Sequence, residues 1–179
     1  MRITFIRHAE TTLNDKNLFS GITEVDITSD GHKAAKELAN SDYFLAGFDA
    51  YYVSPLVRTS QTLEAMYPGV SPIIDSRITE ISLGDWEGLE KTSVDQGLRK
   101  DFLAGLYTPP GGESHEDVCN RLKSFTSDVF KKYPDNASVL VVTHGGVIRT
   151  LKRIWNIDTS EKTKNLGYII LNSDILETV

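Results

Sequence analysis

Short apolar runs alternate along this chain with longer amphipathic segments. The apolar runs predict buried strands at residues 2–6, 49–53, 138–142 and 168–171. Apolar residues three or four positions apart predict helices at residues 28–40, from residue 54 onward, from 114 to about 134, and at 147–155. Strands that alternate with helices favour an α/β fold. We expect a three-layer sandwich in which helices cover both faces of a mostly parallel central sheet.

Start signals support several of these helices. Thr28, Ser29 or Asp30 can cap the first one, and Ser54-Pro55 is a favourable start because serine caps helices and proline suits the first helical position. Ser114 resembles the first residue of a capping box, with aspartate in place of glutamate three positions later. The side chains expected to face inward are Ala34, Ala35, Leu38, Ala39, Leu56, Leu63, Met66, Val118, Leu122, Phe125 and Val129.

Composition narrows the class of protein. The chain has 179 residues, of which 40% are hydrophobic and 25% charged, and we expect a single domain over residues 1–179. Nineteen Lys and Arg residues against 25 Asp and Glu give a net charge of −6. Because such a field repels polyanions, no nucleic-acid partner is expected, and an anionic substrate would need a local basic pocket.

The sequence also favours a particular compartment. Cys119 is the single cysteine, so it cannot close an intrachain disulfide, and we expect a buried thiol in a reducing environment. No stretch approaches the roughly 18 apolar residues of a membrane span, and the apolar run at 3–6 is shorter than a secretory core of about 7–15 residues. We therefore expect a cytoplasmic protein with no membrane partner, either a monomer or a homodimer.

Charged and polar side chains follow three of the predicted strands. Arg7 and His8 come after the first strand, Ser54 and Arg58 after the second, and His144 after the strand at 138–142. Because open α/β sheets bind ligands at the carboxyl ends of their strands, these side chains should converge. Two guanidinium groups suit a phosphoryl or carboxylate group, and a histidine beside them can act as nucleophile, general base or phosphate ligand. Spacing leaves that choice open.

Five stretches resemble, in order, the motifs of the histidine phosphatase superfamily, which has the phosphoglycerate mutase-like fold. They span nearly the whole chain, and the first has Ala9 where glycine is more usual. The stretches are Arg7-His8-Ala9-Glu10-Thr11, Ser54-Pro55-Leu56-Val57-Arg58-Thr59-Ser60-Gln61-Thr62, Glu80-Ile81-Ser82-Leu83-Gly84-Asp85-Trp86-Glu87-Gly88, Pro110-Gly111-Gly112-Glu113-Ser114 and Thr143-His144-Gly145-Gly146.

The resemblance implies a catalytic set without metal or cofactor. His8 would take up the phosphoryl group as a phosphohistidine, and Glu80 would be the general acid and base. The ligands of the phosphoryl oxygens would be Arg7, Arg58 and His144. The resemblance also implies a substrate-holding loop at Asn14, Ser20, Gly21 and Thr23, although Leu18 and Ser20 replace the basic residue and glutamine often found there. Backbone N–H groups at the helix start of Gly145 would add to the anion site.

Three functions remain open at this stage. The segment between Glu80 and Gly111 is short and carries Lys91, Arg99 and Lys100 as its basic residues. Because mutases of the family have a long insertion there with paired basic residues, we favour a phosphomonoesterase acting on a small phosphorylated metabolite. The chain looks most like the small bacterial broad-specificity and α-ribazole phosphate phosphatases. The alternatives are a phosphoglycerate mutase and a non-catalytic protein that binds a phosphorylated ligand.

Other polar residues have more ordinary interpretations. Zinc binding by the two histidines is disfavoured because two arginines beside them would repel a dication. Trp86 and Gly88 are interpreted as structural, and Glu87 as a capping or ion-pair residue. Surface positions are expected for His32, Lys131, Lys132 and residues 162–164. A solvated cap position is favoured for His115, while Glu113 and Ser114 are candidates for the pocket rim.

Overall fold

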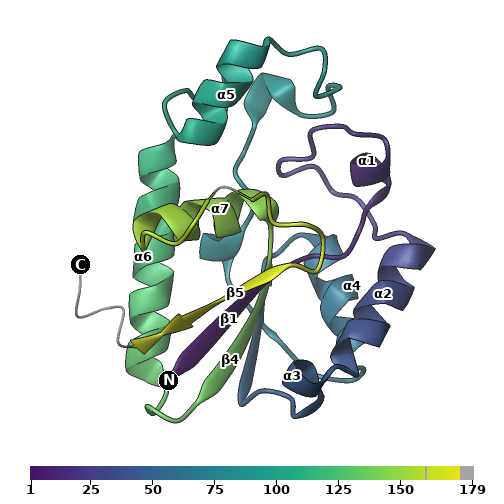
Figure 1. Ribbon diagram of the computed structural model, residues 1–179, viewed down its shortest axis with the longest axis vertical. Helices are drawn as coiled ribbons and strands as arrows, with labels where there is room; N and C mark the ends of the chain where they lie inside the picture. Colours follow the sequence, from purple (N-terminus) through teal and green to yellow (C-terminus); the bar gives the residue numbers. More distant parts are fainter. Residues whose placement is uncertain (160, 174–179) are drawn as a thin grey trace.

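The computed structural model describes residues 1–159 and 161–173, so residue 160 and residues 174–179 of the predicted 1–179 domain lie outside the described residues. The described residues form a five-stranded sheet in the order β3-β2-β4-β1-β5 (Figure 1). The strands are β1 Arg2–Arg7, β2 Ala50–Val53, β3 Ile73–Ile74, β4 Ser138–Thr143 and β5 Tyr168–Asn172. Neighbours pair in parallel except β5, which runs antiparallel to β1. The predicted α/β fold with a mostly parallel sheet is confirmed.

Helices cover both faces of the sheet (Figure 1). On one face, Ile3 and Phe5 of β1 pack into a core with α6 and α7; on the other, Ile6 joins a core with α2 and α4. Successive residues of a strand point to opposite faces, which is why one apolar run supplies both cores. The α-helices are α1 Thr12–Asp15, α2 Ser29–Ala39, α3 Asp42–Leu45, α4 Val57–Met66, α5 Gln96–Ala104, α6 His115–Lys132 and α7 Gly145–Ile154. Two short 3₁₀ turns are η1 Ser76–Ile78 and η2 Gly84–Trp86.

Strand register brings the three polar strand ends together. Arg7 of β1 lies opposite Thr143 of β4, and Val53 of β2 lies opposite Val142 of β4. His8, Ser54 and His144 follow these positions directly, so they emerge at one edge of the sheet. The predicted convergence of the strand ends is confirmed, because parallel strands in register present their carboxyl ends at the same edge.

Two helix predictions were wrong in detail. Helix α4 begins at Val57 with Leu56 at its N-cap, not at Ser54-Pro55. The Ser54 hydroxyl is hydrogen-bonded to Nε2 of His144, at 2.7 Å, and accepts the backbone N–H of Leu56, so it shapes the turn before the helix. Ala34 was expected on the buried side of α2 but is exposed, whereas Ala35 and Ala39 are buried.

Helix α5 lies above the carboxyl edge of the sheet (Figure 1), where Phe102 packs against Trp86 of one core. None of its residues is buried, and Leu98 and Leu103 are 39% and 46% exposed. The sequence patterns did not predict α5, because a helix that buries so little apolar surface leaves a weak apolar periodicity. Among the described residues, no helix combines the length and the apolar character needed to cross a bilayer.

Candidate active site

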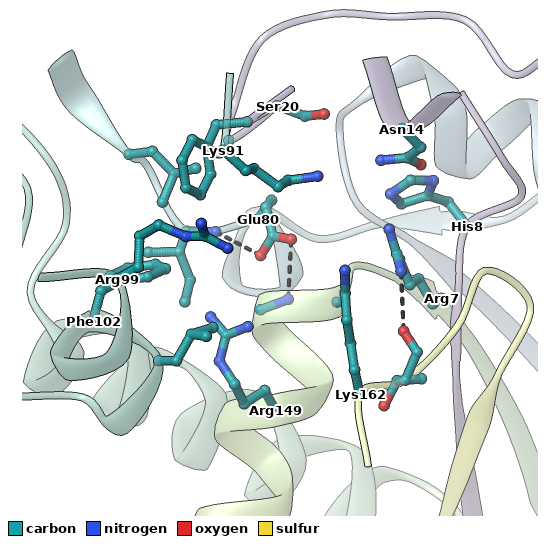
Figure 2. A pocket seen from close by; sticks show the side chains of 18 of the residues that line it. Arg7, His8, Asn14, Ser20, Glu80, Lys91, Arg99, Phe102, Arg149 and Lys162 are labelled. Atoms are coloured by element: carbon teal, nitrogen blue, oxygen red, sulfur yellow. Dashed lines mark hydrogen bonds between the residues drawn. The ribbon is translucent and has the colours of Figure 1, made fainter. Parts of the chain in front are cut away.

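A cavity of about 450 Å³ opens at the carboxyl edge of β1 and β4. Its wall comes from the residues after β1, from α4, from the segment around Glu80, from α5 and α7, and from Thr159 and residues 161–163 (Figure 2). The predicted site residues that line it are Arg7, His8, Asn14, Ser20, Gly21, Arg58, Glu80 and Gly145. The cavity is several times larger than a phosphoryl group, so it has room for the organic part of a ligand.

His8 is a buried, neutral imidazole with a defined tautomer. Its Nδ1 atom lies 2.7 Å from the carbonyl oxygen of Ala9, and a carbonyl only accepts, so Nδ1 carries the proton. Burial lowers the pKa of His8 well below its usual value, and the charges of Arg58 and Arg7 lower it further. Nε2 therefore keeps a lone pair at neutral pH, as a nucleophile requires.

His144 is the second buried imidazole, with its ring centroid 5.3 Å from that of His8. Arg58 donates from Nε to Nδ1 of His144 at 3.3 Å, so the ring proton is on Nε2, which donates to Ser54. Burial is the main cause that lowers the pKa of His144 well below its usual value. His144 does not itself line the cavity wall. It lies behind Arg58 and fixes the direction of that side chain.

The two arginines are held by backbone carbonyls rather than by carboxylates. Arg58 is fully buried and donates to the carbonyls of Gly21 and Thr23, each at 2.8 Å. Arg7 donates to the carbonyl of Thr163, and its buried Nε has no partner among the described residues. Burial lowers the pKa of both guanidinium groups. Both keep further N–H donors for an anion.

Glu80 faces His8 across the cavity (Figure 2). One carboxylate oxygen accepts the backbone N–H of Ile81 at 2.9 Å, and the other accepts that of Gly146 at 3.0 Å. The second bond depends on glycine at 146, because a Cβ atom there would overlap Oε1 of Glu80 and lie 3.0 Å from Cδ1 of Ile81. The first turn of α7 thus sets the position of Glu80.

This contact predicts the effect of Gly146→Ala. The new methyl group should push the Glu80 carboxylate out of place and lower kcat/KM for phosphate release by about 10²-fold, since small misplacements cost that much. Circular dichroism and Tm should show a folded protein. Gly97→Ala in exposed α5, where a methyl group first meets the flexible carboxylate of Asp95, is the control. Wild-type activity in Gly146→Ala would show that the position of Glu80 does not matter.

The loop after β1 is tied down from two sides. Glu87 accepts hydrogen bonds from the N–H of Ile22 and from the hydroxyl of Thr23, the latter at 2.6 Å. Gly21 leaves no room for a side chain, because a Cβ there would overlap the Glu87 carboxylate. Thr23 therefore lies outside the cavity wall, where its carbonyl supports Arg58. The Ser20 hydroxyl is buried without a partner among the described residues and lines the cavity, open to a ligand.

Asn165 is a residue that sequence reasoning missed. Its side-chain amide donates to the carbonyl of His8 at 3.0 Å and to Oδ1 of Asn14 at 3.1 Å. It thereby holds the backbone of His8 and turns the amide nitrogen of Asn14 toward the cavity (Figure 2). No sequence signal pointed to it, because an isolated asparagine before a strand is common in loops.

The candidates at the start of α6 lie away from the cavity wall. Glu113 forms an ion pair with Arg121 at 2.7 Å, and Ser114 caps the helix through the N–H of Asp117. His115 is half-buried against Gly105 and Arg153, so the expected solvated position was wrong. Cys119, beside His115, is half-buried rather than buried. Glu87 is a hydrogen-bonding residue, as predicted, and His32 is exposed.

Sequence reasoning also missed most of the cavity's basic residues. Arg149 of α7 and Lys162 line the wall beside Lys91 and Arg99, whereas Lys100 does not (Figure 2). The expectation that residues 162–164 form a solvated face was therefore wrong for Lys162. The segment 89–109 is poor in cations, as expected, but α7 and the segment after it supply what that segment lacks. Among the residues described, no three His, Cys, Asp or Glu side chains gather to hold a metal ion.

Comparison with known proteins matches both the fold and the motifs. The model of the histidine phosphatase superfamily (branch 1) matches residues 3–168. Phosphoserine phosphatase 1 of Hydrogenobacter thermophilus is 34% identical over 158 residues, which cover 84% of this chain and 74% of that protein. A 2,3-bisphosphoglycerate-dependent phosphoglycerate mutase of Cytophaga hutchinsonii is 32% identical over 159 residues, covering 83% and 74%. The crystal structure of TTHB049 from Thermus thermophilus is 25% identical, with a TM-score of 0.81 over 97% of this chain and 94% of that one.

Proposed function

Since the chain belongs to branch 1 of the histidine phosphatase superfamily, we propose that it is a metal-independent phosphomonoesterase that hydrolyses a small phosphorylated metabolite through a phosphohistidine at His8. The observation that carries this proposal is the state of His8. It is a neutral imidazole whose Nδ1 proton is bonded to the Ala9 carbonyl, and it lies in a cavity lined by Arg7 and Arg58. A nucleophile and two cationic ligands are what phosphoryl transfer needs from a protein.

The first step forms the phosphohistidine. Arg7, Arg58 and the backbone N–H of Gly145 hold the phosphoryl oxygens, while His144 keeps Arg58 in place. Nε2 of His8 attacks phosphorus, and the bond between phosphorus and the ester oxygen breaks. Glu80, in its acid form, gives a proton to that oxygen, so the leaving group departs as an alcohol.

The second step returns the enzyme to its starting state. Glu80, now a carboxylate, takes a proton from a water molecule, and the oxygen of that water attacks phosphorus. The bond from phosphorus to Nε2 breaks, inorganic phosphate forms, and the electron pair returns to the imidazole. Water and the ester are consumed, and an alcohol and phosphate are released.

The test is an assay of inorganic phosphate release from phosphosugars, phosphoglycerates, phosphoserine, nucleotides and phosphopeptides. We expect turnover of at least one class, with the same rate after treatment with EDTA. Orthovanadate should inhibit, because it adopts the five-coordinate geometry of in-line attack at His8. No phosphate release from any ester would contradict the proposal, and so would activity that EDTA removes and a divalent cation restores.

Phosphoglycerate mutase activity is the second candidate, and the cavity's extra cations favour it. A mutase must hold the dephosphorylated intermediate by a second anionic group while the phosphohistidine waits, and Arg149 and Lys162 are placed to do so. The size of the cavity and the exposed α5 argue for access of water instead. With 3-phosphoglycerate and catalytic 2,3-bisphosphoglycerate, we expect free phosphate to form faster than 2-phosphoglycerate. Faster isomerisation would make the chain a mutase.

Two further properties belong to this proposal. A single cysteine, half-buried and unable to form an intrachain disulfide, supports a reducing, cytoplasmic location. The protein would be either a monomer or a homodimer.

A further inference from the structure

The cavity wall carries six cationic side chains beyond Arg7 and Arg58, two of them Lys152 and Arg153 of α7. We name the other four the cationic cluster. They are Lys91, Arg99 on α5, Arg149 on α7 and Lys162. Figure 2 shows Arg99 and Arg149 on the far side of Glu80 from His8 and Asn14, whereas the Lys91 amine extends past Glu80 toward Asn14 and Lys162 lies between Glu80 and Arg7. Within residues 1–159 and 161–173, none of the four has a carboxylate within 4 Å.

Neighbouring cations lower the pKa of Lys91 and of Lys162. Burial and the charges of Lys162, Arg7 and Arg99 bring the pKa of Lys91 to about 8. Burial and the charges of Arg7, Arg149 and Arg99 lower that of Lys162. Mutual repulsion among covered cations disfavours folding, so the cluster does not serve stability. An anion bound among them would remove the repulsion.

Arg149 is held in place by a contact with α5. Its guanidinium carbon lies 5.4 Å above the centre of the Phe102 ring, which holds it against α5. Its Nε atom is buried and has no hydrogen-bond partner among the described residues. Burial lowers its pKa, while the charge of Glu80 raises it. A buried donor without a partner costs free energy, and such groups in native proteins usually mark a ligand site.

The position of Glu80 relates this cluster to the reaction. Because Glu80 would protonate the leaving oxygen, whatever is attached to that oxygen extends past Glu80 and away from His8. Arg149 and Arg99 lie on that side of Glu80 (Figure 2), where the cavity wall also includes the apolar side chain of Phe102. We propose that the leaving group of the substrate carries a second anionic group, a carboxylate or a phosphate, which Arg149, Arg99 and Lys162 bind. This inference rests on the proposed phosphatase function and specifies its substrate class.

Matched substrates test the inference. In 3-phosphoglycerate and glycerol 3-phosphate, a carboxylate replaces a hydroxymethyl group of nearly the same size. The wild-type protein should have a kcat/KM about 30-fold higher for 3-phosphoglycerate, since hydrogen bonds to charged groups are worth that much. Fructose 1,6-bisphosphate against fructose 6-phosphate is the second pair, in which the added anion is a phosphate. If the first pair has the larger ratio of kcat/KM values, the second anionic group is a carboxylate; if the second pair has it, the group is a phosphate.

Substitutions then locate the effect. Arg149→Gln should lower the larger ratio of kcat/KM values at least about tenfold. Arg99→Gln should lower the same ratio, and because Arg99 lies on exposed α5, this variant should still fold. Lys100→Gln, beside Arg99 but outside the cavity wall, is the control and should keep the wild-type ratio. Ratios near one in the wild type, or ratios that survive both Arg149→Gln and Arg99→Gln, would overturn the second anion site. If the protein still releases phosphate from these esters, the proposed phosphatase function remains and only the second anion site is rejected. If it releases phosphate from none of them, the phosphatase function itself is rejected.

Discussion

His8→Ala should lower the rate of phosphate release by at least about 10³-fold, because no other side chain offers the attacking atom and the phosphohistidine cannot form. His8 is buried against Ala9 and the ring of His144, and it contributes little to either apolar core. The variant should therefore remain folded by circular dichroism. Steady-state hydrolysis of the best ester by the purified variant is the measurement.

A labelling experiment separates loss of the nucleophile from general damage. Brief mixing with a ³²P-labelled ester should place acid-labile phosphate on the wild-type protein and none on His8→Ala. His32→Ala removes an exposed histidine of α2 and should match the wild type in both assays. Hydrolysis by His8→Ala within tenfold of wild type, about 1.4 kcal/mol of barrier, would exclude His8 as the nucleophile.

Glu80→Gln should lower kcat by about 10²-fold for alkyl phosphates, because glutamine cannot give a proton to the leaving alcohol. With p-nitrophenyl phosphate, the substitution should slow formation of the phosphohistidine much less, because nitrophenolate leaves without a proton. KM should stay the same or fall. Glu80 is the negative charge that raises the pKa of Arg7, Arg58 and Arg149, so its removal leaves the cavity more positive.

The dependence on the leaving group distinguishes an acid from a structural residue. Glutamine can still accept the N–H of Gly146, so the first turn of α7 should keep its place. Glu116→Gln, on the exposed first turn of α6, is the matched control and should leave both substrates unaffected. An equal loss for alkyl and nitrophenyl esters in a burst-phase measurement would show that Glu80 positions the site and donates no proton.

The sequence by itself determined the sheet and the edge at which the site lies. The runs at Arg2–Arg7 and Ser138–Thr143 are apolar on both sides, as strands buried between two helical layers must be, and the polar residues after them mark their ends. The register of parallel strands then brings Arg7, His8 and His144 together. These features are local in the chain or follow from periodicity, so they are readable without coordinates.

Tertiary structure decided what surrounds that edge. Helix α4 begins at Val57 and not at the predicted Ser54, because the Ser54 hydroxyl is hydrogen-bonded to His144, ninety positions away in the sequence. Asn165 positions His8 and Asn14 by hydrogen bonds, and the N–H of Gly146 positions Glu80 in the same way. Neither role leaves a local pattern.

The cationic cluster shows the same limit most clearly. Lys91, Arg99, Arg149 and Lys162 come from separate segments, and each one alone is an ordinary basic residue that a surface would accept. In the folded chain they share one cavity, where burial and neighbouring cations lower the pKa of Lys91, Arg149 and Lys162. The buried Nε of Arg149 has no hydrogen-bond partner among the described residues. Electrostatic interaction depends on distance in space and on solvent, and neither is written in the order of residues. The sequence therefore predicted that a phosphoryl group is bound, and only the fold brought together the cations from which we infer a second anion on the substrate.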